Sequence, residues 1–178
     1  MILVTGFGPF LDVHRNPSGR LAEAVDGLRI AGHTIVGEVL PVSYRRAPAR
    51  TIALARRHPP LFVLGMGVAS GRDRPMVEVL GVRRTHDTLA DVDGVVGPVL
   101  GEGPPSRRAT LDVDTLAEAL GCAVSEDAGT YVCNAWLYEV VGALPDLPVA
   151  FLHVPPAGMP RDTLLAGLRA LVASAATT

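Results

Sequence analysis

Short apolar runs alternate along the chain with segments of helical period, and this alternation constrains the fold more than any other feature. The apolar runs predict strands at Ile2–Thr5, Thr34–Leu40, Leu61–Gly67, Met76–Val82 and Val149–Val154. The segments between them predict helices at Pro17–Asp26, Arg45–Arg57, Val113–Leu120, Asn134–Leu144 and Arg161–Ser174. Strands that alternate with helices form a mainly parallel sheet covered on both faces. The sequence therefore predicts an α/β fold, a three-layer α/β/α sandwich in which ligands bind at the carboxyl ends of strands.

Nothing in the sequence marks a domain boundary. The segment Thr85–Arg108 is rich in Gly, Pro and Asp and has no clear period, which predicts a long excursion or hairpin rather than a linker. A length of 178 residues, 48% of them hydrophobic, suits one core. We therefore expect residues 1–178 to form a single domain.

The charge and hydropathy patterns argue against nucleic acid and membrane partners. A net charge of -2 and a pI near 6.2 provide no basic face for phosphates or anionic lipids. No apolar run reaches the roughly 18 residues that a spanning helix needs. Met1 leads directly into an apolar strand pattern without a charged leader, and the two cysteines lie in unrelated settings. We therefore expect a cytoplasmic protein without disulfides.

Residue usage also limits the chemistry. All 16 basic residues are arginine, so a Walker P-loop, a Schiff-base lysine, bound pyridoxal phosphate and a Ser-Lys dyad are excluded. The glycine clusters at Gly6–Gly8 and Gly65–Gly67 follow strands but lack the GxGxxG spacing of a dinucleotide site. The cysteines and histidines form no metal-ligand pattern, so we expect neither a metal nor a cofactor. His14, His33, His58 and His86 lie in polar or loop contexts and are expected to be surface groups.

Cys133 follows the turn signal of Gly129 and precedes a helical pattern. Its thiol is therefore predicted to lie at a helix N-terminus, where the macrodipole and free backbone N–H groups favour the thiolate and can bind an oxyanion. A small cysteine packed beneath the helix fits the spacing equally well. Cys122, flanked by small and apolar residues at the start of an apparent strand, is expected in the core.

Two further residues fit roles in acid–base chemistry. His153 lies near the end of the apolar run Val149–Val154, where this fold class places a base, although a hydrogen-bonded core histidine fits the same pattern. Glu78 interrupts the strand Met76–Val82 and could orient a histidine as the third member of a triad. The alternative for Glu78 is an outward residue of a half-exposed strand.

Together these segments resemble the pyroglutamyl peptidase I (pyrrolidone carboxyl peptidase) family, cysteine peptidase family C15. Four signatures carry the resemblance in family order: Thr5-Gly-Phe-Gly-Pro-Phe with Asn16-Pro-Ser; Gly67-Val-Ala-Ser-Gly-Arg72 leading to Glu78; Ser125-Glu-Asp-Ala-Gly-Thr-Tyr-Val-Cys133-Asn with Tyr138; and Phe151-Leu-His153-Val-Pro. The resemblance implies a phosphorylase/hydrolase-like fold and a cysteine exopeptidase with Cys133, His153 and Glu78 as its triad. It also implies a homo-oligomer, since relatives are often dimers or tetramers.

The resemblance further implies a small peptide substrate with an N-terminal pyroglutamyl group. The positions that match the family's ring pocket are apolar: Phe7, Phe10, Val42, Val68, Tyr131 and Val132. The Val68 main chain would bond the lactam. His153 would take the proton of Cys133, the thiolate would attack the pyroglutamyl carbonyl, and His153 would protonate the departing amine.

The chain departs from the family after Glu78. Val79 and Thr88 stand where the family has arginines, the second of them linked to oxyanion stabilisation, and Arg83 stands where it has an asparagine. Arg83 or Arg84, in a rearranged loop, is the alternative donor. These departures leave two other hypotheses open. One keeps the triad with another N-acyl or lactam substrate, and the other is a non-catalytic binder of small ligands.

Overall fold

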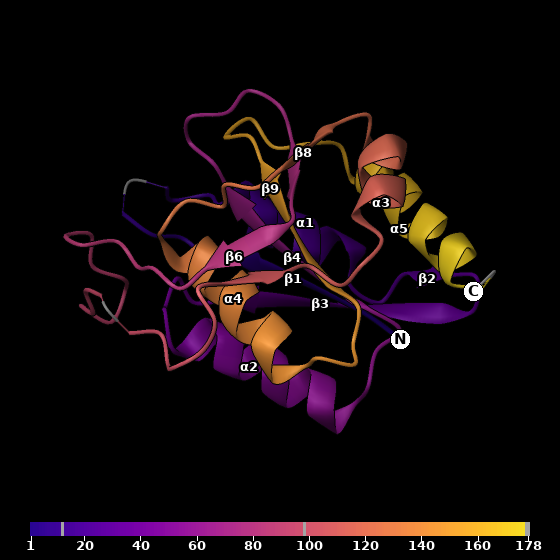
Figure 1. The fold of residues 1–178 in the computed structure, drawn as a ribbon. Helices are drawn as coiled ribbons and strands as arrows, with labels where there is room; N and C mark the ends of the chain where they lie inside the picture. The colour runs from indigo at the N-terminus through magenta and orange to yellow at the C-terminus, as the bar shows by residue number, and fades with distance from the viewer. Residues whose placement is uncertain (12, 98, 177–178) are drawn as a thin grey trace.

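The protein is built around a seven-stranded sheet, seen in a computed structural model that describes residues 1–11, 13–97 and 99–176. The strand order is β2-β3-β1-β4-β9-β5-β8. Figure 1 shows the sheet between its helices. Its strands are β1 (Ile2–Phe7), β2 (Arg29–Ile30), β3 (His33–Leu40), β4 (Val63–Val68), β5 (Met76–Glu78), β8 (Ala123–Ser125) and β9 (Val149–Val154). The central strands β3, β1, β4 and β9 are parallel, whereas β2 and β5 pair antiparallel with β3 and β9. The predicted, mainly parallel sheet is confirmed.

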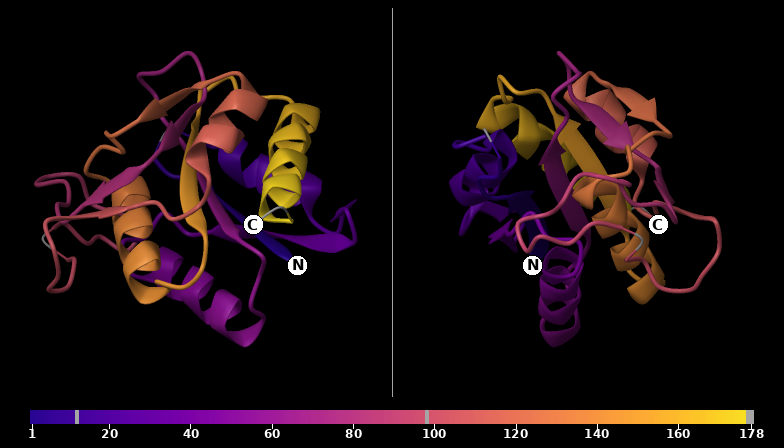
Figure 2. Two further views of the ribbon diagram at one scale, coloured as in Figure 1. Left: turned by 45° about the vertical axis from the view of Figure 1, so that its right-hand side comes forward. Right: turned by 90° about the vertical axis from the view of Figure 1, so that its left-hand side faces the viewer.

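Helices cover both faces of the sheet (Figures 1 and 2). One face carries α1 (Pro17–Val25), α3 (Val113–Leu120) and α5 (Arg161–Ala175), and the other carries α2 (Arg46–Arg57) and α4 (Val132–Ala143). Successive residues of a strand point to opposite faces, so Ile2 and Val4 enter the first core and Leu3 enters the second. The three-layer sandwich is therefore confirmed. Among the described residues, no helix combines the length and apolarity needed to cross a membrane.

The entry into α1 fixes the end of β1. Asn16 caps the helix, because its Oδ1 accepts hydrogen bonds from the Ser18 backbone N–H at 3.1 Å and from the Ser18 hydroxyl at 2.8 Å. Pro17 occupies the first turn, where its missing N–H costs nothing. The Ser18 hydroxyl then accepts from the Phe7 backbone N–H at 3.0 Å. Phe7 is thus held at the carboxyl end of β1.

The strand predicted at Met76–Val82 is wrong as one element, because its pairing partners change at Val79. β5 joins the central sheet, while β6 (Leu80–Val82) pairs antiparallel with β7 (Ser106–Arg108) in a separate two-stranded sheet. Val79 connects the two sheets, since its N–H donates to Ser125 O and its carbonyl accepts from Ala109 N–H, both at 2.9 Å. The segment after β6 therefore returns through β7, as the predicted hairpin requires.

A buried hydrogen bond joins α2 to α4 and allows a test of this packing. The Trp136 indole N–H donates to the Thr51 hydroxyl at 2.9 Å, and both side chains are fully buried. Thr51→Val should lower the free energy of unfolding by about 1–3 kcal/mol, because the indole N–H loses its acceptor. Urea unfolding measures this change. Thr51→Ser keeps the hydroxyl and serves as the control, and a Thr51→Val variant as stable as the wild type would contradict the assignment.

Candidate active site

A cavity of about 410 Å³ opens where β1, β4 and β9 end and α4 begins. This is the edge of the sheet at which the sequence predicted a site. Cys133 and His153 both line the cavity. So do all six positions predicted to form the ring pocket: Phe7, Phe10, Val42, Val68, Tyr131 and Val132.

Cys133 is the second residue of α4 and lies against the sheet. A Cβ atom added to Gly67 would lie only 2.5 Å from Cys133 Sγ, so the thiol sits directly over this glycine. Gly67 of β4 pairs in register with His153 of the neighbouring strand β9. Because adjacent strands lie about 4.8 Å apart, the thiol and the imidazole are neighbours within one cavity.

His153 is held by a carboxylate from the next strand. In the antiparallel register of β5 and β9, Glu78 lies opposite Phe151, so His153 is its diagonal neighbour on the same face. His153 Nδ1 and Glu78 Oε1 are 2.8 Å apart. Glu78 is fully buried, which shows that the outward, half-exposed alternative is wrong. With Nδ1 engaged by the carboxylate, Nε2 is the ring nitrogen left for chemistry in the cavity.

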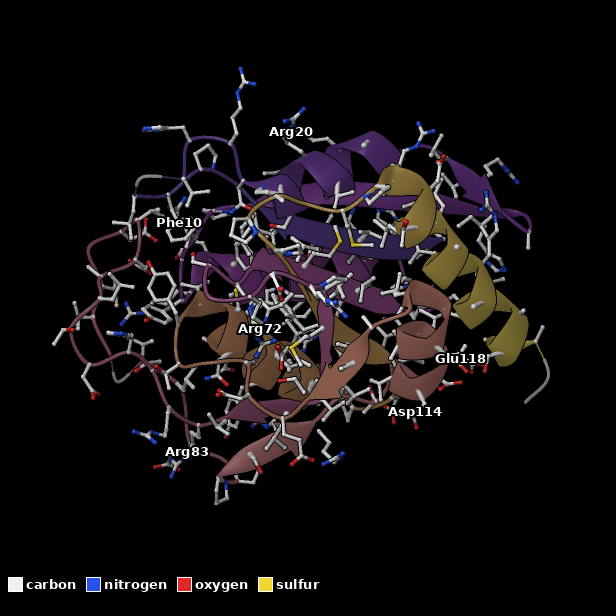
Figure 3. The ribbon with its side chains drawn as sticks, turned by 90° about the horizontal axis from the view of Figure 1, so that it is seen from above. Phe10, Arg20, Arg72, Arg83, Asp114 and Glu118 are labelled. Atoms are coloured by element: carbon white, nitrogen blue, oxygen red, sulfur yellow. The ribbon has the colours of Figure 1, made fainter. Side chains whose placement is uncertain are left out.

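Arg72 is a site residue to which the sequence analysis gave no role. Its guanidinium donates to Glu78 Oε1, to the Ser125 hydroxyl at 3.3 Å and to the Asp127 carbonyl at 2.8 Å. Figure 3 places its side chain near the centre of the molecule, and it also lines the cavity. Arg72 thereby neutralises the buried carboxylate and ties it to the loop that precedes α4. The only sequence feature that indicated a role for Arg72 was its place in the motif that leads to Glu78.

Burial sets the protonation of both catalytic candidates. Burial alone would raise the pKa of Glu78, but hydrogen bonds from His153, Ser125 and Arg72 bring the pKa below its usual value. For Cys133, burial and then the negative charge of Glu78 raise the pKa to about 12. The thiol lies at the helix N-terminus, as predicted, and its burial there opposes the ionisation that a helix N-terminus favours. A base beside the thiol is the group that can offset this effect of burial.

The comparisons with known proteins agree with this architecture. The pyroglutamyl peptidase family model matches residues 1–175. The chain belongs to the pyroglutamyl peptidase family. A pyrrolidone-carboxylate peptidase from Coprothermobacter proteolyticus is 31% identical over 195 residues, covering 96% of this chain and 94% of that protein. The pyroglutamyl peptidase I structure from Bacillus amyloliquefaciens superposes with a TM-score of 0.87 at 25% identity, covering 99% of this chain and 95% of the other.

A second solved structure supports the fold alone. The pyrrolidone carboxyl peptidase from Thermococcus litoralis gives a TM-score of 0.86 at 24% identity, covering 99% of this chain and 93% of that chain. The cysteine peptidase family C15 assignment and the α/β fold predicted from the sequence are thus both confirmed.

The positions at which this chain departs from its family do not line the cavity. Arg83, Arg84 and Thr88 are exposed, and Figure 3 shows Arg83 at the periphery of the molecule. Val79 is buried in the turn between β5 and β6. His86, predicted to be a surface group, instead lines the cavity. No spacing in the sequence indicated this, because the loop that carries His86 is positioned by contacts with distant residues.

Other predicted site features have structural explanations. Cys122 is half-buried and packs against the core beneath α1, α3 and α5, as expected.

Asn134 lies beside the nucleophile candidate and holds a neighbouring loop, since its side chain accepts from Val82 N–H at 2.8 Å and donates to Val82 O and Arg84 O. Among the described residues, no group of three or more His, Cys, Asp or Glu side chains could hold a metal ion.

The lowered pKa of Glu78 predicts a pH dependence of stability. A carboxylate with a depressed folded pKa contributes fully above its unfolded value, near 4.5, and this contribution is lost as the pH falls through the folded pKa. Glu78→Gln should therefore reduce the free energy of unfolding at pH 7 by about 1–3 kcal/mol, and the difference from wild type should shrink as the pH falls from 4.5 through the lower folded pKa. Urea unfolding across this range measures it. Glu126→Gln, at an exposed ion pair with Arg108, should change little at any pH.

Proposed function

We propose that the protein is a cysteine exopeptidase that hydrolyses an N-terminal pyroglutamyl group from peptides, with Cys133 as nucleophile, His153 as general base and acid, and Glu78 as the orienting carboxylate. The observation that carries the proposal is the placement of the Cys133 thiol beside a histidine whose Nδ1 lies 2.8 Å from a buried carboxylate oxygen. A nucleophile, a base and a group that orients the base are the three parts that acyl transfer requires. Membership of the pyroglutamyl peptidase family supports the substrate class.

The reaction begins from the neutral thiol. His153 Nε2 takes the Cys133 proton as Sγ attacks the pyroglutamyl carbonyl carbon, and the carbonyl electron pair moves to oxygen. The carbon–nitrogen bond then breaks, and the imidazolium gives its proton to the departing amine, leaving a thioester. Water attacks the thioester while His153 takes its proton, and the carbon–sulfur bond breaks to release pyroglutamate and the thiol. Glu78 stabilises the imidazolium in both halves without accepting the proton.

The backbone at Val68 supports lactam recognition. Alternate residues of a strand direct their backbone groups to opposite sides, and Ala69 N–H donates to Val154 O on β9. The Val68 backbone therefore faces the β1 side, where the ladder between β1 and β4 ends at Gly65. Its N–H and C=O are thus available to a lactam, which carries one donor and one acceptor. The cavity's apolar walls suit a ring without charge.

The start of α4 supplies donors for the oxyanion. The first backbone N–H groups of a helix have no intrahelical acceptor, and no side chain caps this helix at Tyr131. The N–H groups of Val132 and Cys133, at the helix end that carries the thiol, can therefore donate to the oxyanion. The same helix end carries the nucleophile, so attack and charge stabilisation occur at one place.

The direct test offers the purified protein a fluorogenic pyroglutamyl amide beside the prolyl and free-amine glutamyl amides. Hydrolysis of the pyroglutamyl amide alone is expected, because the six apolar side chains of the ring pocket do not compensate a charged amino group for the loss of its hydration. Cys133→Ser should abolish turnover. Equal hydrolysis of all three amides, or turnover that survives Cys133→Ser, would contradict the proposal.

Thiol reactivity tests the role of the base. The pKa of both cysteines is raised by burial, so at neutral pH neither should be alkylated quickly without help. His153→Ala should slow iodoacetamide alkylation of Cys133 by at least tenfold, because the variant removes the group that takes the thiol proton; general-base assistance is worth about 10²–10⁴. Peptide mapping by mass spectrometry follows both sites. Alkylation of Cys122 should not change and is the internal control.

A further inference from the structure

We propose that His86 is a catalytic residue of this protein, whose Nε2–H donates a hydrogen bond to the oxyanion that forms when Cys133 attacks a carbonyl. This inference rests on the proposed acyl transfer and goes beyond it, because it adds a side-chain donor to the backbone N–H groups of α4. Two observations support it. The first is the set of contacts that attach the loop of residues 84–92, and the second is that one of the two ring nitrogens of His86 already accepts hydrogen bonds.

The 84–92 loop is tied down on both sides of the nucleophile. At its start, Asn134 Nδ2, next to Cys133 in the chain, donates to Arg84 O at 2.8 Å. Near its end, the Tyr131 hydroxyl donates to Ala90 O at 2.8 Å. Tyr131 and Asn134 flank Cys133 at the start of α4. The loop therefore crosses the N-terminus of α4, and His86 lies between the two anchors.

The far end of the loop is equally fixed. Val92 N–H donates to Val42 O at 3.1 Å, and the buried Asp91 carboxylate accepts from Tyr44 N–H at 2.9 Å. The same carboxylate accepts from the backbone N–H groups of Asp93 and Val95. The loop is thus held in place beside the cavity. His86, which is half-buried, is the loop residue that lines the cavity.

The backbone assigns the two ring nitrogens of His86. Nδ1 accepts hydrogen bonds from the N–H groups of Leu89 at 3.0 Å and Thr88 at 3.3 Å. A nitrogen that accepts carries no proton, so the neutral imidazole holds its proton on Nε2. Within the described residues, Nε2 has no hydrogen-bond partner. The ring, held at Nδ1, therefore keeps a free N–H donor at Nε2 on a residue that lines the cavity.

Most other side-chain donors of the cavity are already committed. Arg72 binds Glu78 and its neighbours, the Tyr131 hydroxyl binds Ala90 O, and the Asn16 amide donates to Gly8 O at 3.1 Å. Besides His153, which serves as the base, His86 and Thr130 remain. The Thr130 hydroxyl rotates freely about its bond, whereas the His86 ring is fixed by two backbone contacts. A fixed donor is the kind that stabilises developing charge without reorganisation.

Two substitutions separate the donor from the loop contact. In His86→Asn the side-chain oxygen can replace Nδ1 as acceptor for the Thr88 and Leu89 N–H groups, as asparagine does in turns, but no donor reaches the cavity. In His86→Gln an amide nitrogen reaches the former place of Nε2. Thr130→Val removes the competing hydroxyl, and Thr88→Ala changes only an exposed side chain of the same loop.

The experiment compares two reactions of Cys133 in the full-length protein. Acylation by p-nitrophenyl acetate passes through an oxyanion, whereas alkylation by iodoacetamide does not. His86→Asn should slow acylation by about 10²-fold while alkylation is unchanged, since one oxyanion donor is typically worth ~10²–10³ in rate. His86→Gln should recover part of the loss, and Thr88→Ala and Thr130→Val should react as wild type does.

The outcomes separate this inference from the proposed function. Undiminished acylation in His86→Asn, equal slowing of both reactions, loss confined to Thr130→Val, or a wild type that is not acylated at all would overturn the role of His86. Because p-nitrophenyl acetate has no lactam, the test does not require the pyroglutamyl substrate. The wild type could fail to hydrolyse the pyroglutamyl amide while His86→Asn still selectively loses acylation. That result would refute the proposed substrate and support the role of His86 as oxyanion donor.

Discussion

The site depends first on the buried carboxylate of Glu78. Its Oε1 lies within hydrogen-bond distance of His153 Nδ1 and accepts from Arg72, and Arg72 also donates to Asp127 O in the loop before α4. A buried charge is costly unless it is paired and hydrogen-bonded, so these groups must assemble together. The antiparallel placement of β5 makes this possible, because it brings Glu78 diagonally across from His153. One carboxylate therefore joins two strands and the start of the helix that carries Cys133.

The second constraint is that two glycines of β4 leave α4 room to pack closely against the sheet. Added Cβ atoms would lie 2.5 Å from Trp136 at Gly65 and 2.5 Å from Cys133 Sγ at Gly67, so larger residues would push α4 away from the sheet. Close approach puts the thiol beside His153, and it also buries the thiol in part. The same packing that brings Cys133 beside His153 therefore raises the pKa of Cys133.

The sequence predicted features that depend on local pattern and failed on those that depend on distant partners. The alternation of apolar runs predicted the layers, and strand and helix ends placed His153 and Cys133 correctly. The break at Val79 was hidden because both halves of the apolar run are buried, in different sheets. A carboxylate within a strand pattern is typical of an exposed residue, and the sequence does not show that Arg72 lies beside Glu78 in the fold. The helix dipole alone favoured a thiolate at Cys133, because a sequence does not show desolvation.

The orientation of His86 depends on the backbone of its own loop. The backbone N–H groups of Thr88 and Leu89 bind His86 Nδ1, and this turn leaves the Thr88 side chain exposed while the imidazole faces the cavity. The orientation of the proposed donor therefore depends on backbone geometry rather than on the reach of a long side chain. Asn134 adjoins the nucleophile and also holds the start of this loop. Asn134 therefore links the helix that carries Cys133 to the loop that carries His86.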